Sequence, residues 1–287
     1  HNPFHYAMVF ADGHAIDFEY RGAEHLAKGL ETIDEIRPGT SWFYMYTAER
    51  QEEFVEKWAN EVVSALKERN GGNMRLAVDK LEPPGVDALR RRGVTLVEGQ
   101  ELTEMARCIK SDDELELMGW TIRVCEAGMA RMYEHSLPGK TEQEIWAELH
   151  FENIRSGGEW LETRLLAIGE RTNPWFQECG PRIVQDNEIV AFDTDLIGSY
   201  GICIDISRTW WVGHARPSNA MISAMNHGLD HIRDHQARLK PGVTIRELTF
   251  GGHQLEDRYW KQKYSCKMHG VGLCDEWPFV PYPDAWV

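Results

Sequence analysis

The spacing of apolar residues predicts that the N-terminal part of the chain alternates between strands and helices. Residues 6–20 (YAMVFADGHAIDFEY) have the pattern of two strands around a turn at Asp12-Gly13. Residues 49–69 carry apolar side chains at helical spacing, and Asn70-Gly71-Gly72 follows as a stop. The apolar positions of that helix are Phe54, Trp58, Val62 and Leu66. The next segments predict strand, short helix and strand, in order 74–79, 85–93 and 94–99. This alternation predicts an α/β domain that ends near residue 105.

A different pattern begins near residue 107. Ser111 and Glu114 form a capping box, which predicts the start of a helix with one apolar face. That face is formed by Leu115, Met118, Ile122, Cys125, Met129 and Met132. Thr141 and Glu144 predict the start of another helix. We therefore expect one domain over residues 1–106 and a second over residues 107–287.

The remainder of the second domain is predicted to contain two strands and two helices. Residues 188–213 have the pattern strand, turn, strand; a long helix should cover about 218–239, and Thr244 with Glu247 caps one more. Three histidines recur every four residues on the long helix: His227, His231 and His235. The zinc motif HExxH has this spacing but needs a Glu that is absent here. The opposite face is apolar (Ile222, Met225, Leu229 and Ile232), so we expect the histidines to face solvent.

Three acids in the strand-turn-strand segment carry the clearest chemical signal. Strands are normally depleted in Asp, yet Asp193, Asp195 and Asp205 lie in or beside the apolar strands IVAF and GICI. If these strands form a hairpin, Asp193 or Asp195 comes opposite Asp205. Facing carboxylates repel unless a cation lies between them, which favours a divalent metal site. The alternative is that two are solvent-facing turn acids and one caps a helix.

His269 is a possible nitrogen ligand for such a site. It lies in Met268-His269-Gly270-Val271-Gly272, where the glycines allow the backbone to approach a ligand closely. A purely structural role is the alternative for a single histidine.

Composition narrows the classes of partner. The formal net charge of −15, from 31 basic and 46 acidic residues, argues against nucleic-acid and anionic-membrane partners. Six scattered cysteines without a CxxC pair favour a reduced, cytoplasmic protein. No stretch approaches the roughly 20 apolar residues that a membrane span needs. Because the chain starts at His1 and ends at Val287 in a Pro- and aromatic-rich stretch, we expect a fragment that lacks the start of its first domain and the end of its second.

Four motifs follow one another along residues 107–287. They are Arg107-x-x-Lys110-Ser111, Pro138-Gly139-Lys140-Thr141-Glu142, Asp205-Ile206-Ser207-Arg208-Thr209 and His269-Gly270-Val271-Gly272. Their order and approximate spacing resemble the creatinase/aminopeptidase P/prolidase superfamily, which has the pita-bread fold. The resemblance implies a mixed α/β (α+β) protein with a creatinase-like N-terminal α/β domain and a C-terminal pita-bread domain.

The same resemblance implies a dinuclear metal site whose usual ligands are two Asp, one His and two Glu. Asp205 and His269 match the second Asp and the His. The family spacing to the first Asp falls on Thr194, so its neighbours Asp193 and Asp195 both remain candidates. The two Glu are expected on strands beyond residue 287.

Two histidines that contact substrate in peptidases of this superfamily are missing. One should lie seven residues after the ligand His, where this chain has Glu276. The other should fall within residues 173–177, which contain no His. By analogy with oxyanion-hole deletions, each lost donor costs roughly 3 kcal/mol, so peptide hydrolysis is disfavoured.

The segment from Tyr264 to Glu276 is instead similar to the pita-bread dimethylsulfoniopropionate (DMSP) lyases, the DddP family, as is the upstream segment 172–175. This resemblance implies a homodimer that uses iron, or zinc or manganese, to cleave a small zwitterion into dimethyl sulfide and acrylate. It assigns Asp275 as the base. The implied metal ligands are Asp193, Asp195, Asp205 and His269.

β-Elimination suits these residue types. It needs a base for the proton α to a carboxylate and a Lewis acid for the developing charge. Asp275 should have a raised pKa because of the adjacent Glu276 and partial burial. Aromatic faces hold a sulfonium cation, at roughly 0.5–2 kcal/mol each. The candidate substrate-binding residues are Trp175, Tyr264, Glu276 and Trp277, and Tyr264 is also a catalytic candidate; for the aromatic residues a core role is the alternative.

Two other functions stay open at this point. One is an Xaa-Pro metallopeptidase with an unusual substrate pocket. The other is a non-catalytic binding protein on the same fold, although three Asp and one His argue against loss of the metal.

Overall fold

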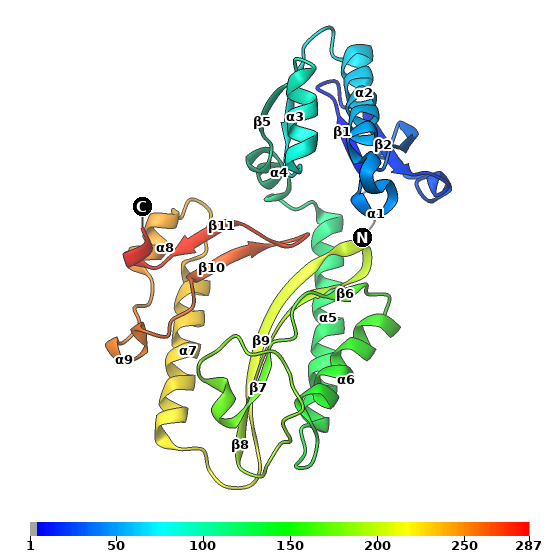
Figure 1. The fold of residues 1–287 in the computed structure, drawn as a ribbon. Helices are drawn as coiled ribbons and strands as arrows, with labels where there is room; N and C mark the ends of the chain where they lie inside the picture. The colour runs from blue at the N-terminus through cyan, green and yellow to red at the C-terminus, as the bar shows by residue number, and fades with distance from the viewer. Residues whose placement is uncertain (1–4, 287) are drawn as a thin grey trace. The chain divides into compact units, whose positions relative to one another are not determined.

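The computed structural model describes residues 5–286, and His1 and Val287 lie outside the described residues. The chain divides into two compact units between Thr103 and Glu104, close to the boundary expected after residue 106 (Figure 1). Both helices and strands occur in each unit, so the mixed α/β class is confirmed.

The N-terminal unit contains two small sheets and the helices that lie against them. Its strands are β1 (Tyr6–Val9), β2 (Ala15–Tyr20), β3 (Glu35–Gly39), β4 (Arg75–Val78) and β5 (Thr95–Glu98). Its helices are α1 (Tyr44–Thr47), α2 (Gln51–Arg69), α3 (Pro83–Arg91) and α4 (Gln100–Arg107), the last of which crosses the division. β2 lies between an antiparallel β1 and a parallel β3, and β4 pairs in parallel with β5. The predicted hairpin and the strand-helix-strand order are confirmed.

Helix α2 buries one face against the β2 strand. Trp58, Val62 and Leu66 belong to the same buried cluster as Ile16 and Phe18. Since alternate strand residues point to opposite faces, Ile16 and Phe18 occupy the helix side of β2. The helix ends at Asn70, whose amide bonds back to Leu66, as the Asn-Gly-Gly stop predicts.

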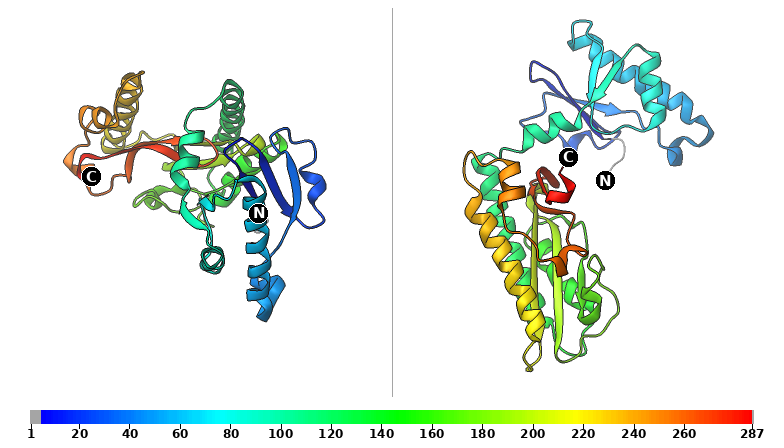
Figure 2. Two further views of the ribbon diagram at one scale, coloured as in Figure 1. Left: turned by 90° about the horizontal axis from the view of Figure 1, so that it is seen from above. Right: turned by 90° about the vertical axis from the view of Figure 1, so that its left-hand side faces the viewer.

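The C-terminal unit combines a four-stranded sheet, two helices packed on it and a separate hairpin (Figures 1 and 2). The sheet strands are β6 (Trp160–Leu161), β7 (Leu166–Ile168), β8 (Glu188–Ile197) and β9 (Cys203–Val212), and the hairpin strands are β10 (Cys266–Val271) and β11 (Asp275–Pro281). The helices are α5 (Asp112–His135), α6 (Glu142–Arg155), α7 (Asn219–Arg238), α8 (Ile245–Gly251) and α9 (Asp257–Trp260). All three predicted capping boxes are present, at Ser111, Thr141 and Thr244.

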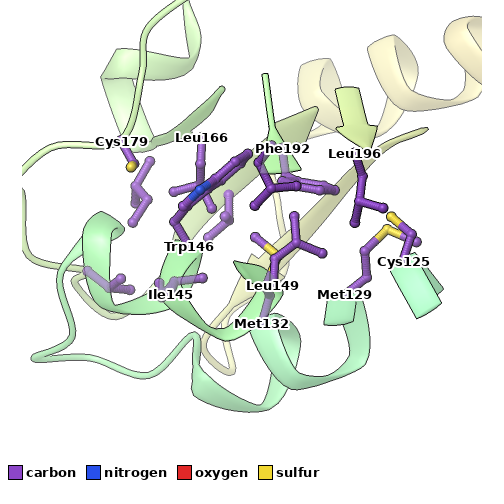
Figure 3. Close-up of a cluster of buried hydrophobic side chains, with 14 of the residues drawn as sticks. Cys125, Met129, Met132, Ile145, Trp146, Leu149, Leu166, Cys179, Phe192 and Leu196 are labelled. Atoms are coloured by element: carbon purple, nitrogen blue, oxygen red, sulfur yellow. The ribbon is translucent and has the colours of Figure 1, made fainter. Parts of the chain in front are cut away.

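The core of this unit lies between the sheet and helices α5 and α6 (Figure 3). Phe192 and Leu196 of β8 pack there with Trp146 and Leu149 of α6 and Met132 of α5. Each fully buried large side chain contributes roughly 1.5–3 kcal/mol to folding. Because Val190, Phe192, Thr194 and Leu196 alternate along β8, the residues between them lie on the other face of the sheet.

The apolar face predicted for α5 is correct only in its C-terminal half. Cys125, Met129 and Met132 are buried, but Leu115 is 55% exposed and Ile122 37% exposed. A strict seven-residue spacing drifts around a helix with 3.6 residues per turn, so the ends of such a stripe face different directions.

The expected orientation of α7 is wrong. His235 is 3% exposed, whereas Met225 and Ile232 on the opposite face are 44% and 54% exposed. The imidazoles contact one another and the segment after α8: the His227 ring lies 4.5 Å from that of His253 and 5.1 Å from that of Tyr259. An imidazole ring has an apolar body and a polar tip, so it can be buried against an aromatic neighbour. On α7 the histidine face finds such neighbours among the described residues, whereas the apolar face does not.

Within residues 5–286, none of the helices combines the length and the apolar composition that crossing a bilayer requires.

Candidate metal centre

The β8–β9 hairpin brings three acids to one face of the sheet. Asp195 lies directly opposite Asp205, and Asp193 lies opposite Ser207. Thr194 between them is fully buried toward the helices, so Asp193 and Asp195 share the other face. The pairing expected from the sequence is confirmed. Thr194, at the position where the family spacing would put the first ligand Asp, points to the opposite face and does not take that place.

The β10–β11 hairpin adds an imidazole and a fourth carboxylate. His269 Nε2 lies 3.4 Å from Asp205 Oδ2, and His269 Nδ1 lies 3.7 Å from Asp275 Oδ1. Nδ1 also lies 2.9 Å from the Gly270 carbonyl oxygen, which can only accept, so Nδ1 carries the proton and donates. Nε2 faces the Asp205 carboxylate, and once it loses its proton its lone pair can bind a metal ion, as in a metal-binding histidine. Ligand atoms of Asp205, His269 and Asp275 all lie within 4.8 Å of one another.

A backbone bond links the two hairpins. The Cys203 amide, at the start of β9, donates to the Gly272 carbonyl at 2.6 Å. Gly272 follows β10 directly, so this bond holds the His269 strand beside the strand that carries Asp205.

The carboxylates on the sheet are crowded and partly removed from water. Burial and the neighbouring Asp205 carboxylate together raise the pKa of Asp193 to about 7. Burial also raises the pKa of Asp195, although the Thr163 hydroxyl opposes this effect. Adjacent carboxylates that resist ionisation are relieved by a cation between them.

The pKa values of His269 and Asp275, on the β10–β11 hairpin, are also shifted. The hydrogen bond with Asp205 raises the pKa of His269 to about 9. Burial raises the pKa of Asp275; His269 opposes this, and Asp205 and Glu162 add to it. The expected like charge on Asp275 therefore comes from Asp205 and Glu162 rather than from Glu276. Carboxylate oxygens with an imidazole nitrogen form a donor set that suits a divalent transition-metal ion, so these residues fit such a group.

The structure does not bring Glu276 to this site. Its side chain is fully buried and pairs with Lys110 and, at 2.9 Å, with Arg107 Nε. Neighbouring strand residues point in opposite directions, so Asp275 at the same end of β11 faces the acids while Glu276 faces away. This orientation corrects its expected role in substrate binding.

A cavity of about 570 Å³ opens beside the acids, and residues from several elements line it. Trp175 and Tyr264 lie in its wall, as expected, and the Tyr264 ring stacks on Phe176 with centroids 5.5 Å apart. Burial raises the pKa of Tyr264, which keeps its hydroxyl protonated. Trp277, also expected to bind substrate, is 44% exposed and does not line the cavity. Its backbone amide donates to the Glu104 carboxylate at 2.8 Å. Among the described residues that line the cavity, His269 is the only imidazole.

Sequence reasoning missed two residues that support the site. Thr163 Oγ1 donates to Asp195 Oδ2 at 2.8 Å. Glu142 is fully buried and accepts from the amides of Ile168 and Gly180 and from Arg171. These bonds fasten both ends of the loop that carries Trp175. A Glu directly after a predicted helix cap was visible in the sequence, but its long-range partners were not.

The match to known families rests on the C-terminal unit. The model of metallopeptidase family M24 matches residues 116–286, more than half of the chain. This chain belongs to metallopeptidase family M24. The metal-binding interpretation of the acids and His269 is therefore consistent with a family of divalent-metal enzymes.

Curated relatives and solved structures add two further findings. Over 99% of this chain, "Dimethylsulfoniopropionate lyase DddP" from Roseovarius nubinhibens is 51% identical and the protein of that name from Roseobacter denitrificans is 47% identical. The chain spans 65% of the length of each. An Xaa-Pro dipeptidase from Bacillus anthracis superposes with a TM-score of 0.74 at 21% identity, covering 97% of this chain and 75% of the dipeptidase. Prolidase from Pyrococcus furiosus gives 0.74 at 19% identity, covering 97% and 77%. These structures establish the pita-bread fold.

Proposed function

We propose that this chain forms most of a metal-dependent carbon–sulfur lyase that cleaves DMSP into dimethyl sulfide and acrylate. The proposal is supported by the name shared by two relatives at 51% and 47% identity. The observation that carries it is the position of Asp275, an acid beside His269 and Asp205 in a site where the described cavity wall offers no second imidazole.

In this proposal Asp193, Asp195, Asp205 and His269 hold the metal ion, which we propose to be iron. When bound, the ion would stabilise the negative charge that develops on the substrate carboxylate. A homodimer and a cytoplasmic location are further parts of the proposal; the first rests on the resemblance to the DMSP lyases, the second on the six free cysteines.

Asp275 would act as the base. Its carboxylate takes the proton from the carbon α to the substrate carboxylate, the electrons of that C–H bond form the C=C bond of acrylate, and the C–S bond breaks with its electron pair on sulfur. The positive charge of the sulfonium is thereby neutralised, so dimethyl sulfide leaves without an acid. The pKa of Asp275, raised by burial, makes it a better proton acceptor. Its side chain is 50% exposed, so the proton can pass to solvent.

The aromatic wall would hold the sulfonium group. Trp175 and Tyr264 line the cavity beside the acids, and Phe176 stacks on Tyr264 and fixes the orientation of its ring. A cation over each aromatic face gains roughly 0.5–2 kcal/mol. The Tyr264 hydroxyl, kept protonated, can donate to the substrate carboxylate.

The decisive experiment replaces Asp275 in the full-length protein. With metal supplied, headspace gas chromatography should detect dimethyl sulfide from DMSP, and Asp275→Asn should lower kcat by roughly 10²–10⁴-fold because the base is lost. The control is Asp284→Asn, an exposed acid that pairs with Lys263, and it should retain activity. Cleavage of Xaa-Pro dipeptides without release of dimethyl sulfide would establish a peptidase instead.

A further inference from the structure

The N-terminal unit contains a second trio of ligand-type side chains, well separated in sequence from the site above. Among residues 5–286, only two groups place three such ligand atoms within 4.8 Å of one another, and the second consists of His5, Asp17 and Glu19. None of the three has a role in the proposed lyase reaction.

The β-sheet register explains why these three residues meet. Ile16 and Phe18 face the core beneath α2, so Asp17 and Glu19 share the opposite face of β2. β1 pairs antiparallel with β2, with Tyr6 opposite Phe18 and Ala7 opposite Asp17. His5 directly precedes Tyr6, and continuing this register places it beside Glu19. The small side chain of Ala7 leaves space between His5 and Asp17.

Both carboxylates are buried, which is costly for unpaired charges. The Asp17 side chain is 4% exposed and that of Glu19 10% exposed. Among the described residues Asp17 Oδ2 has no hydrogen-bond partner, and Glu19 Oε1 accepts only from the Tyr20 amide. The His5 side chain, 48% exposed, is the one ion-pair partner found for either acid within the described range.

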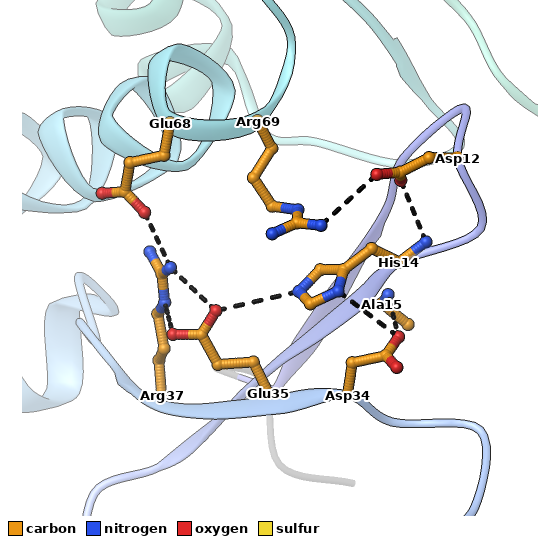
Figure 4. A network of polar contacts seen from close by, with 8 residues as sticks. All are labelled: Asp12, His14, Ala15, Asp34, Glu35, Arg37, Glu68 and Arg69. Carbon is orange, nitrogen blue, oxygen red and sulfur yellow. Dashed lines mark hydrogen bonds and ion pairs between the residues drawn. The ribbon is translucent and has the colours of Figure 1, made fainter.

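Several more exposed acids of this unit pair with arginine (Figure 4). Glu35 and Glu68 both pair with Arg37, and Asp12 pairs with Arg69. Those acids lie at 40–60% side-chain exposure. Asp17 and Glu19, the most buried acids of this unit, have instead only a half-exposed imidazole as cationic partner, the reverse of the usual arrangement for buried charge.

We propose that His5, Asp17 and Glu19 form a second divalent-metal site, suited to zinc or a similar transition-metal ion. His5 Nε2 lies 2.5 Å from Asp17 Oδ1 and 3.8 Å from Glu19 Oε2. An ion bound to all three at about 2.0–2.2 Å needs ligand atoms roughly 3–4 Å apart. The half-exposed His5 ring can move outward by the small amount required, and its exposure leaves the ion's remaining position open to water.

The test uses the full-length protein, stripped with a chelator and reloaded with Zn²⁺ alone. Bound zinc per chain is measured by mass spectrometry after desalting, and affinity by calorimetry. The double variant Asp17→Asn/Glu19→Gln should bind one zinc ion fewer than the parent. His5→Gln should lower the zinc affinity of this site at least about tenfold. Glu49→Gln, an exposed acid of the same unit, is the matched control and should bind as the parent does.

The comparison is repeated in a His269→Gln background, in which the site on the β8–β9 sheet binds metal more weakly. The double variant should still bind one zinc ion fewer in that background. Equal zinc content in the double variant and the Glu49→Gln control would overturn the proposal, leaving His5 and Asp17 as an ion pair only. If circular dichroism shows that the double variant does not fold, His5→Gln decides the question, because His5 is half exposed. Unchanged zinc affinity in His5→Gln would then also overturn it.

Discussion

At the residue scale, hydrogen bonds behind the acids should control metal affinity. Thr163 donates to Asp195 Oδ2, and this bond favours the ionised carboxylate that a metal needs. We expect Thr163→Val to weaken metal binding by roughly 10–100-fold while the fold is retained. Metal titration followed by calorimetry measures this. The control is Ser199→Ala, whose hydroxyl bonds to Gly157 instead; equal affinity in the two variants would contradict the role of Thr163.

Proton competition at two of the same residues should make metal uptake depend on pH. In the metal-free protein the pKa of Asp193 is raised to about 7 and that of His269 to about 9. Both groups must lose a proton to bind a metal, so affinity should fall as pH falls from 8 to 6. We expect about a tenfold loss per pH unit, steeper below 7 where Asp193 also protonates. Binding isotherms at pH 6, 7 and 8 check this, and Asp193→Asn should remove the steeper part.

At the scale of single elements, strand β11 divides its first two side chains between two tasks. Asp275 faces the acids, while Glu276 is anchored to Arg107, the last residue of α4, and to Lys110, which precedes α5. The anchor fixes the strand and hence the direction of its neighbour. The two basic residues of the Arg107-x-x-Lys110 motif therefore hold β11 in place, a role that their spacing in the sequence did not predict.

Removing one partner of that buried charge should destabilise the unit. We expect Lys110→Met to lower the free energy of unfolding by about 3 kcal/mol, because Glu276 loses a partner with no water to replace it. Lys140→Met is the control, since Lys140 pairs with Glu144 on an exposed helix turn and should cost no more than about 0.5 kcal/mol. Urea denaturation measures both. A loss as small for Lys110 as for Lys140 would show that Arg107 alone neutralises Glu276.

At the scale of the whole chain, the histidine face of α7 links stability to pH. Burial, together with the neighbouring His235 and His253, lowers the pKa of His231 to about 4. Between pH 6.5 and 4 the unfolded chain therefore binds a proton that the folded chain does not, so stability should decrease as pH falls through this range.

We expect the His231 contribution to be on the order of 1 kcal/mol, given its partial exposure. Thermal unfolding of metal-free protein at pH 7, 6 and 5 should show a smaller decrease in His231→Gln than in the parent. The exposed His214, replaced in the same way, is the control. An identical pH profile in all three proteins would mean that His231 takes up its proton equally readily in the folded and the unfolded chain, which would contradict the prediction.

Features that depend only on neighbouring residues could be predicted before the structure. Capping boxes, the Asn-Gly-Gly stop and the β8–β9 hairpin are encoded within short segments, so the helix starts and the pairing of Asp205 with Asp193 or Asp195 could be predicted. The structure shows that the partner is Asp195. The motif order gave the family, and the resemblance named the residues of the site. Three other features depend on distant segments and appear only in the folded chain: the approach of His269 to Asp205, the sides to which Asp275 and Glu276 turn, and the buried face of α7. These depend on which surfaces pack together, and a local pattern contains no information about its distant partner.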